Sequence, residues 1–97
     1  MEREDLTKLY ATARVTIEDV KANMQDIYVT TINPFGKPIT IVAVKMQNGY
    51  TIVDSTTCVS PANYSEEIGK TICLEHIEDQ VWKLLGYALQ DKLQPTK

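Results

Sequence analysis

The 97-residue chain is 43% hydrophobic and 24% charged, with a net charge of −3 and scattered Lys and Arg, so it lacks the basic face of a duplex nucleic-acid binder. The charged opening Glu2–Lys8 does not read as a signal peptide, and no apolar run approaches the ~20 residues of a membrane span, so we expect no membrane partner. A chain of this length buries roughly 60–65% of its unfolded surface, which favours assembly with further copies.

The first 14 residues are expected to form a charged N-terminal arm, and residues 15–97 a single α+β domain. A short helix is predicted after Thr16, because Thr is a good N-cap and Asp19 follows at capping-box spacing. The apolar positions of this helix fall on one face: Ile17, Val20 and Met24.

Three β-strands are predicted next, as an antiparallel meander: Asp26–Ile32, Ile39–Met46 and Tyr50–Ser55. The loop NPFGKP separates the first two, because two prolines and a glycine interrupt any regular structure. The middle strand, ITIVAVKM, is apolar at successive positions and is therefore expected to be covered on both faces. The dipeptide Asn48-Gly49 predicts a type I′ hairpin turn into the third strand.

The last third of the sequence predicts one long helix over about residues 65–92. One apolar stripe recurs at steps of three to five residues: Ile68, Ile72, Ile77, Val81, Leu84 and Ala88. A second stripe is displaced around the helix: Leu74, Trp82, Leu85 and Leu89. At 1.5 Å per residue the helix is roughly 40 Å long, longer than a small meander is wide.

One three-stranded sheet can cover only one of these stripes, so the other predicts a homo-oligomer. Gly86 would permit close helix–helix approach at such a contact. Both Gly69 and Gly86 weaken the helix locally, because glycine is a poor helix former.

Catalytic and metal sites are not expected, and we predict that the protein is not an enzyme and uses no cofactor. The single histidine, His76, is next to Glu75 in the predicted helix, and adjacent helix residues do not face each other. Cys58 and Cys73 have no zinc-ligand spacing and are predicted to be unpaired thiols. None of the four glycines belongs to a phosphate-binding loop.

The stretch CVSPANYSEEIGK, residues 58–70, supports two interpretations. In the first, Asn63 caps the long helix with Glu66 at capping-box spacing, or Ser65 caps it, and Tyr64 packs against the sheet. In the second, the free amides of the helix N-terminus bind an anion. A base would then stack on Tyr64 or Tyr50, and Lys70 would add a cation.

Four segments resemble those of a family of small tailed-phage proteins from unassigned early genes. They are VTIEDV (15–20), NGY (48–50), CVSPANYSEEIGK (58–70) and VWKLLGY (81–87), and together they extend from residue 15 to about residue 90. This family also resembles the first-described Thoeris anti-defence proteins. The resemblance implies a phage-encoded sponge in the host bacterial cytoplasm, built from a sheet and helices and assembled as a dimer or a trimer of dimers.

Such sponges sequester cyclic ADP-ribose signals, and some take cyclic oligonucleotides of CBASS immunity, without cleaving them. The resemblance places Asn63 in the ligand pocket and offers Tyr50 and Tyr64 as stacking groups. Relatives often carry a basic residue at the position of Gln80, where it could meet phosphate. Arg14 and Lys70 are the possible substitutes for that charge.

Two other functions remain open. The protein could instead bind and inhibit a host protein through its apolar helix surface, or it could be a small enzyme that acts on cyclic nucleotides. The missing base and metal site argue against the enzyme.

Overall fold

The computed structural model describes residues 14–58 and 60–94, so the expected N-terminal arm lies outside the described residues except for Arg14. Two α-helices, three strands and one 3-10 turn follow in chain order: α2 (Ile17–Asn23), β1 (Met24–Ile32), β2 (Ile39–Met46), β3 (Thr51–Thr57), η1 (Pro61–Asn63) and α3 (Glu66–Leu93). The α+β class, the short first helix and the long last helix are all confirmed.

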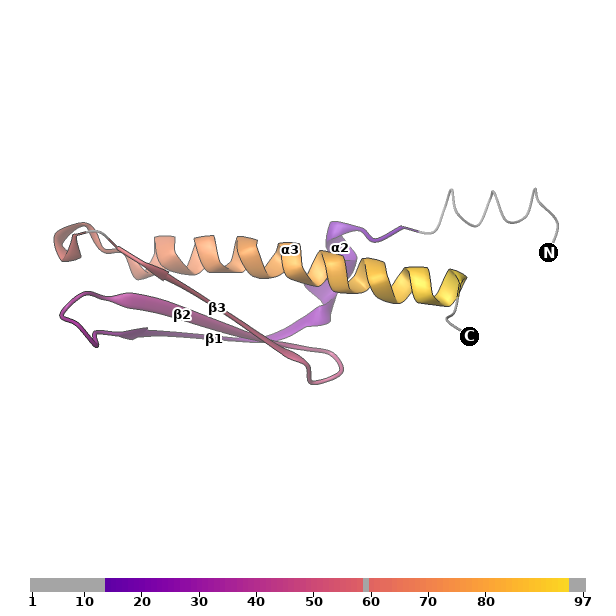
Figure 1. Ribbon diagram of the computed structural model, residues 1–97, viewed down its shortest axis with the longest axis horizontal. Coiled ribbons are helices and arrows are strands. Elements are labelled where there is room, and N and C mark those ends of the chain that lie inside the picture. The colour runs from indigo at the N-terminus through magenta and orange to yellow at the C-terminus, as the bar shows by residue number, and fades with distance from the viewer. Residues whose placement is uncertain (1–13, 59, 95–97) are drawn as a thin grey trace.

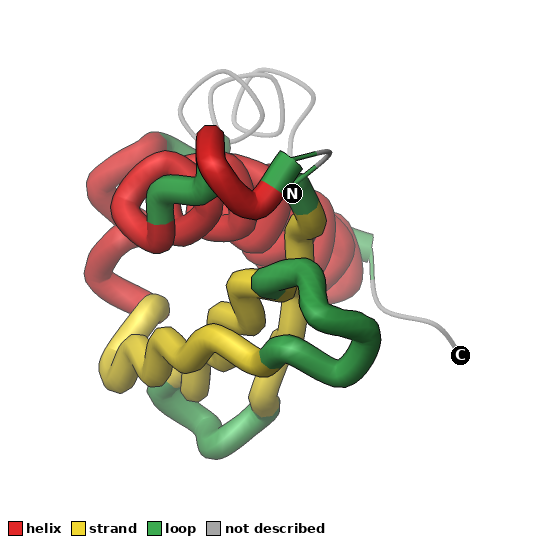
Figure 2. The backbone as a smooth tube through the Cα atoms, turned by 90° about the vertical axis from the view of Figure 1, so that its left-hand side faces the viewer, coloured by secondary structure: helices red, strands yellow, loops and turns green. Residues whose placement is uncertain are grey.

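The three strands form one antiparallel sheet in the order β1-β2-β3, which confirms the predicted meander. Figure 1 shows α3 running along one face of this sheet, with α2 beside the C-terminal half of α3. The end-on view in Figure 2 shows the helices as one layer and the strands as the other. The molecule therefore has a single helix-covered sheet face, called here the inner face, and an outer face.

The helix α2 begins with the predicted capping box. The Asp19 N–H donates to Thr16 Oγ1 (3.2 Å) and the Thr16 N–H donates to Asp19 Oδ2 (2.9 Å). These bonds, led by the one from the Thr16 backbone, lower the pKa of the Asp19 carboxyl. The expected position of Met24 on this helix was wrong, because the chain turns extended there and Met24 begins β1.

The central strand β2 is buried on one face only, so the prediction that both faces are covered was wrong. Alternate residues point into the inner face and are buried: Thr40, Val42, Val44 and Met46. Their neighbours Ile39, Ile41 and Ala43 lie half-exposed on the outer face, because both helices pack on the opposite side. The outer face also carries Tyr28 and Val53, beside Ala43 in the sheet register.

The hairpin between β2 and β3 differs from the expected type I′ turn. A type I′ turn needs a positive φ at both central residues, whereas here Gly49 alone has one (+90°) and Asn48 does not. The Gly49 N–H donates to the Met46 carbonyl (2.9 Å) and the Met46 N–H to the Tyr50 carbonyl (2.8 Å). This pattern is typical of a three-residue loop with a glycine bulge.

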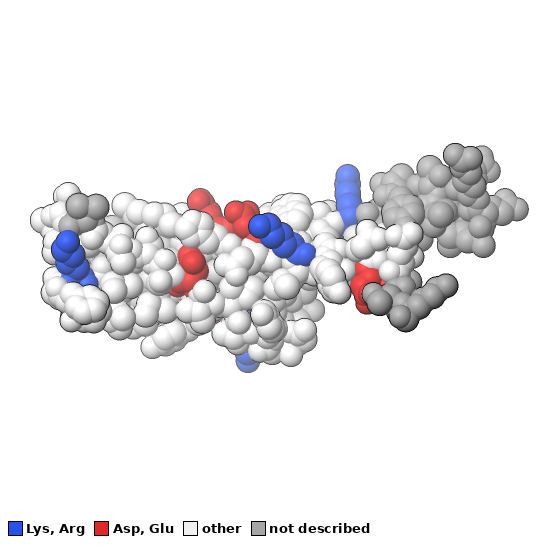
Figure 3. Space-filling view, viewed as in Figure 1, with Lys and Arg blue, Asp and Glu red and all other residues white. Residues whose placement is uncertain are grey.

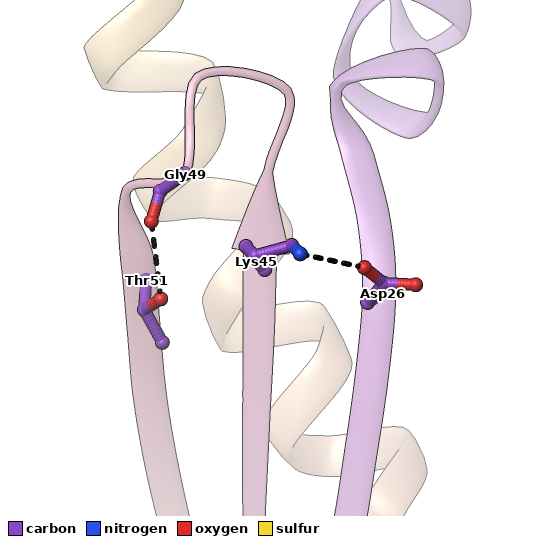
Figure 4. A network of polar contacts seen from close by, with 4 residues as sticks. All are labelled: Asp26, Lys45, Gly49 and Thr51. Atoms are coloured by element: carbon purple, nitrogen blue, oxygen red, sulfur yellow. Dashed lines mark hydrogen bonds and ion pairs between the residues drawn. The ribbon is translucent and has the colours of Figure 1, made fainter.

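Polar contacts on the outer face secure this end of the sheet (Figure 4). The Lys45 ammonium lies 3.1 Å from the Asp26 carboxylate across β1 and β2, and both side chains are more than half exposed. Thr51 donates its hydroxyl to the Gly49 carbonyl (3.3 Å) at the start of β3. An exposed pair of this kind contributes at most about 1 kcal/mol.

The helix α3 buries a different stripe from the expected one. Its buried residues recur at steps of four: Gly69, Cys73, Ile77 and Val81. Ile77 and Val81 belong to both the predicted and the observed stripe, but Ile68 and Leu84 are 62% and 41% exposed. A Cβ on Gly69 would lie 2.5 Å from Thr40 Oγ1, so the glycine is what allows α3 to approach β2 this closely.

The second predicted stripe is only partly uncovered. Leu74 and Leu85 pack against the core, whereas Trp82 is 42% exposed. Among the described residues, no helix combines the length and hydropathy that a membrane span requires.

Candidate functional site

The six predicted ligand residues lie in separate parts of the molecule. Tyr50 and Gln80 line one hollow near the β2–β3 hairpin. Asn63 and Tyr64 line another near the start of α3. The remaining two, Arg14 and Lys70, lie in neither of these hollows.

The hollow near the hairpin, called here the hairpin hollow, lies between the first half of β3 and the middle of α3. Its lining includes Tyr50, Thr51, Val53, Gln80, Lys83 and Leu84. Tyr50 follows the bulged turn and is 58% exposed. Lys83 lies one helical turn beyond Gln80, so their side chains project on the same side of α3.

This combination of groups suits a nucleotide. The exposed ring of Tyr50 offers a stacking face for a base. Gln80 offers an amide donor and acceptor, and the ammonium of Lys83 can pair with a phosphate oxygen. Lys83 places a positive charge in the same hollow.

The hollow near the start of α3, called here the entrance hollow, is lined by both β3 and α3. Its lining includes Thr57, Cys58, Asn63, Tyr64, Ile68 and Ile72. The Tyr64 hydroxyl lies 2.5 Å from Thr31 Oγ1 and 3.0 Å from the buried Thr40 Oγ1. Thr31 also contacts the Glu66 carboxylate. The half-buried Tyr64 thus closes the end of the inner face, as one interpretation of this stretch expected.

Asn63 does not cap α3, so that part of the prediction was wrong. Ser65 is the cap, because its hydroxyl accepts the Ile68 N–H (3.3 Å). Asn63 ends the preceding 3-10 turn, where its N–H donates to the Ser60 carbonyl (3.0 Å). The exposed Asn63 side chain therefore lies beside the entrance hollow without the capping role.

The other two candidate cations are placed apart from these groups. Arg14 lines a third hollow between α2 and the C-terminal part of α3, together with Asp19 and Lys92. Lys70 is exposed in the second turn of α3. Neither residue lines the hollow that contains Tyr50 and Gln80.

A polar cluster missed by the sequence analysis lies midway along α3. The His76 Nδ1 is 2.8 Å from Asp54 Oδ2 on β3. Cys73, one turn before His76, is buried, and burial together with the charge and hydrogen bonding of Asp54 raises the pKa of its thiol. The sequence feature that could have indicated this cluster is Asp54, because its place between Ile52 and Thr56 gives it an inward-facing position on β3.

This arrangement does not activate Cys73, because a raised pKa keeps the thiol protonated. We therefore expect a disulfide-exchange reagent at neutral pH to modify Cys58, which is half-buried, and to leave Cys73 unmodified in the folded protein. Peptide mass spectrometry after the reaction measures both sites. The Cys58→Ser variant should then be unreactive until it is unfolded in denaturant. Equal modification of Cys73 in the folded and unfolded protein would contradict this expectation.

Within residues 14–58 and 60–94, no three His, Cys, Asp or Glu side chains are grouped closely enough to hold a metal ion.

The model of the phage protein (N4 Gp49/phage Sf6 gene 66) family matches residues 15–93, which includes every described helix and strand. No curated protein and no solved structure is significantly similar to the chain.

Proposed function

Because the chain belongs to the phage protein (N4 Gp49/phage Sf6 gene 66) family, we propose that it is a phage anti-defence sponge, which binds a cyclic nucleotide immune signal and sequesters it without cleavage. Its ligand is a cyclic ADP-ribose isomer or a cyclic oligonucleotide, taken up in the host bacterial cytoplasm. The sequence resemblance to the Thoeris anti-defence proteins supports this proposal.

The single observation that carries the proposal is the composition of the hairpin hollow. Tyr50, Gln80 and Lys83 bring an aromatic ring, an amide and an ammonium group to one depression of the surface. These are the three kinds of group that recognise a base and its phosphate. His76, the single histidine of the sequence, is paired with Asp54 outside this hollow, which favours binding over acid–base chemistry.

The test is uptake followed by release. The protein is incubated with cyclic ADP-ribose isomers and cyclic dinucleotides, separated from free nucleotide, and heated, and the released material is identified by mass spectrometry. Release of the unchanged nucleotide supports the sponge. Release of an altered nucleotide would contradict the sponge and indicate an enzyme that acts on the nucleotide.

We expect Lys83→Gln to weaken nucleotide binding by about 10- to 150-fold, because a hydrogen bond to a charged group contributes roughly 1.5–3 kcal/mol. The matched control is Lys37→Gln, which removes an exposed lysine from the loop between β1 and β2 and should bind as the wild type does. Calorimetric titration measures both affinities. Equal weakening by the two substitutions would indicate a general charge effect and not a contact of Lys83.

A second candidate function is the inhibition of a host protein. The observation that favours it is the exposure of large apolar side chains: Phe35 is 87% exposed, Tyr87 74% and Trp82 42%. Uncharged surface also covers most of the face seen in Figure 3. If the wild type takes up no nucleotide, this candidate becomes the better account.

A further inference from the structure

A further hollow, called here the sheet-end hollow, lies where the β2–β3 hairpin meets α2 and the second half of α3. Three amide side chains line it: Asn23, Gln47 and Asn48. It adjoins the hairpin hollow, because Tyr50 and Leu84 line both. Its volume is about 330 Å³, at the small end of the roughly 300–1,000 Å³ of ligand pockets. The sheet-end hollow therefore extends the candidate site beyond Tyr50 and has room for a base with its ribose.

The three amides are each fixed by a hydrogen bond through one of their two polar atoms. Asn23 Oδ1 accepts the Gln47 N–H (3.3 Å), and Asn48 Oδ1 accepts the Tyr50 N–H (3.0 Å). Gln47 Nε2 donates to the Ala22 carbonyl (3.1 Å). Among the described residues, the other polar atom of each amide has no protein partner. The lining thus offers a ligand two Nδ2 donors and one Oε1 acceptor.

The hairpin holds Tyr50 at the boundary between the two hollows. Its N–H donates to Asn48 Oδ1, and its carbonyl accepts the Met46 N–H (2.8 Å). The positive φ of Gly49 (+90°) allows the chain to turn between these two bonds. The backbone of Tyr50 is therefore fixed on both sides, which sets where its ring leaves the hairpin.

The two hollows differ in charge. None of the described residues that line the sheet-end hollow is charged, and Met46, Leu84 and Leu85 give it an apolar surface. Such a surface suits the uncharged ring of a base, which would also stack on Tyr50. The hairpin hollow contains the ammonium of Lys83, which suits a phosphate. The base and the phosphate of one nucleotide therefore find their matching groups on either side of Tyr50.

We propose that the sheet-end hollow is the base subsite of the nucleotide site and that it selects adenine. This inference rests on the proposed function and names the base that its site takes. The 6-amino group of adenine is a donor between two ring acceptors, N1 and N7, which matches one Oε1 acceptor and two Nδ2 donors. Guanine and hypoxanthine carry a carbonyl oxygen at position 6, which cannot donate to Gln47 Oε1. Gln47 is therefore the residue that determines the choice of base.

The first experiment compares adenine with hypoxanthine in the same nucleotide. The protein is titrated calorimetrically with cyclic ADP-ribose and cyclic di-AMP, and with the form of each in which hypoxanthine replaces adenine. We expect the wild type to bind the adenine form at least about tenfold more tightly, because hypoxanthine leaves the Gln47 acceptor unpaired and opposite a carbonyl. Equal affinities for the two forms would overturn the base subsite.

The second experiment removes the acceptor. Gln47→Met keeps the length of the side chain and should weaken binding of the adenine form about 3- to 10-fold. Binding of the hypoxanthine form should stay within about twofold of the wild type, so the preference for adenine falls to about threefold or less. A merely structural role of Gln47 would weaken both forms equally and preserve the preference, which would overturn the inference.

Gln25→Met is the matched control for the bond to Ala22. Gln25 Nε2 donates to the same Ala22 carbonyl (2.9 Å), but Gln25 does not line the sheet-end hollow. This variant should bind both forms as the wild type does. Equal loss of affinity in Gln25→Met and Gln47→Met would assign the effect to the lost bond to Ala22 and overturn the contact with the base.

The outcomes separate this inference from the proposed function. Binding that is weakened by Lys83→Gln and unchanged by Gln47→Met overturns the base subsite and leaves the sponge in place. Absence of uptake of every nucleotide by the wild type overturns both. A preference for adenine that is lost in Gln47→Met and kept in Gln25→Met supports the base subsite.

Discussion

Replacing Gly69 with alanine is expected to destabilise the protein by about 1–3 kcal/mol, although alanine is the better helix former. The added Cβ would lie 2.5 Å from the Oγ1 and 2.9 Å from the Cβ of Thr40, which is fully buried and bonded to the Tyr64 hydroxyl. The strain therefore falls on β2 and on the contact that closes the inner face. Urea denaturation followed by circular dichroism measures the free energy of unfolding.

Gly86→Ala is the matched control on the same helix. A Cβ at Gly86 would have no atom within 4 Å, so this substitution should stabilise α3 by about 0.5–1 kcal/mol. A Thr40→Ala substitution should reduce the cost of Gly69→Ala only in part, because it removes Thr40 Oγ1 at 2.5 Å but keeps the Cβ at 2.9 Å. Equal changes in the free energy of unfolding for the two glycine substitutions would show that the contact with Thr40 does not destabilise Gly69→Ala. Dissociation of an oligomer by Gly86→Ala would instead support the close helix–helix contact expected from the sequence.

Because the resemblance to the Thoeris anti-defence proteins places Asn63 in the ligand pocket, Asn63→Asp is expected under the proposed function to lower nucleotide affinity at least about tenfold while leaving the fold intact. The carboxylate cannot donate a hydrogen bond as the amide does, and it would add a negative charge beside a phosphate. The stability should change by less than about 0.5 kcal/mol, because Asn63 is exposed and is not the helix cap. Calorimetric titration of cyclic ADP-ribose and thermal unfolding measure the two quantities.

Ser65→Ala is expected to have the opposite effects on stability and on nucleotide affinity. It removes the hydroxyl that accepts the Ile68 N–H and should cost about 0.5–2 kcal/mol of stability, with affinity retained at low temperature. The pair of variants thus separates capping from ligand binding within three residues of sequence. Binding of Asn63→Asp as tight as that of the wild type would mean that the pocket excludes Asn63.

The elements of the fold could be predicted because their signals are local. Strand β2 has the predicted bounds, Ile39–Met46, and α3 extends over Glu66–Leu93 where about 65–92 was expected. Thr16 and Asp19 form the capping box that their spacing indicated. Periodicity, caps and turn residues act over a few positions, so the sequence displays them directly.

The buried face of α3 could not be predicted in the same way. Hydrophobicity ranks Ile68 and Ile72 above Gly69 and Cys73, yet the smaller pair is buried against the sheet. At position 69 the close approach to Thr40 leaves no room for a Cβ. The choice between Asn63 and Ser65 as cap depended on the 3-10 turn that precedes α3.

The sequence predicted individual residues of the candidate site but not which of them lie close together in the fold. Tyr50 and Gln80 are brought together by packing of α3 on β3, which no local pattern specifies. The contact between Asp54 and His76 likewise joins residues 22 positions apart. Lys83 was not predicted as a site residue, because its place beside Gln80 depends on the helical turn between them.

The order of the elements along the chain has a consequence for folding. Strands β1, β2 and β3 are joined by short connections, so their pairing requires the closure of small loops only. The apolar inner face, with Val42, Val44 and Ile52, stays in contact with water until α3 arrives, and α3 follows all three strands in the chain. A chain emerging from the ribosome therefore exposes an open sheet before it can bury its core. Such a sheet is prone to aggregation. The docking of α3 buries its inner face and therefore removes the surface through which nascent chains would aggregate.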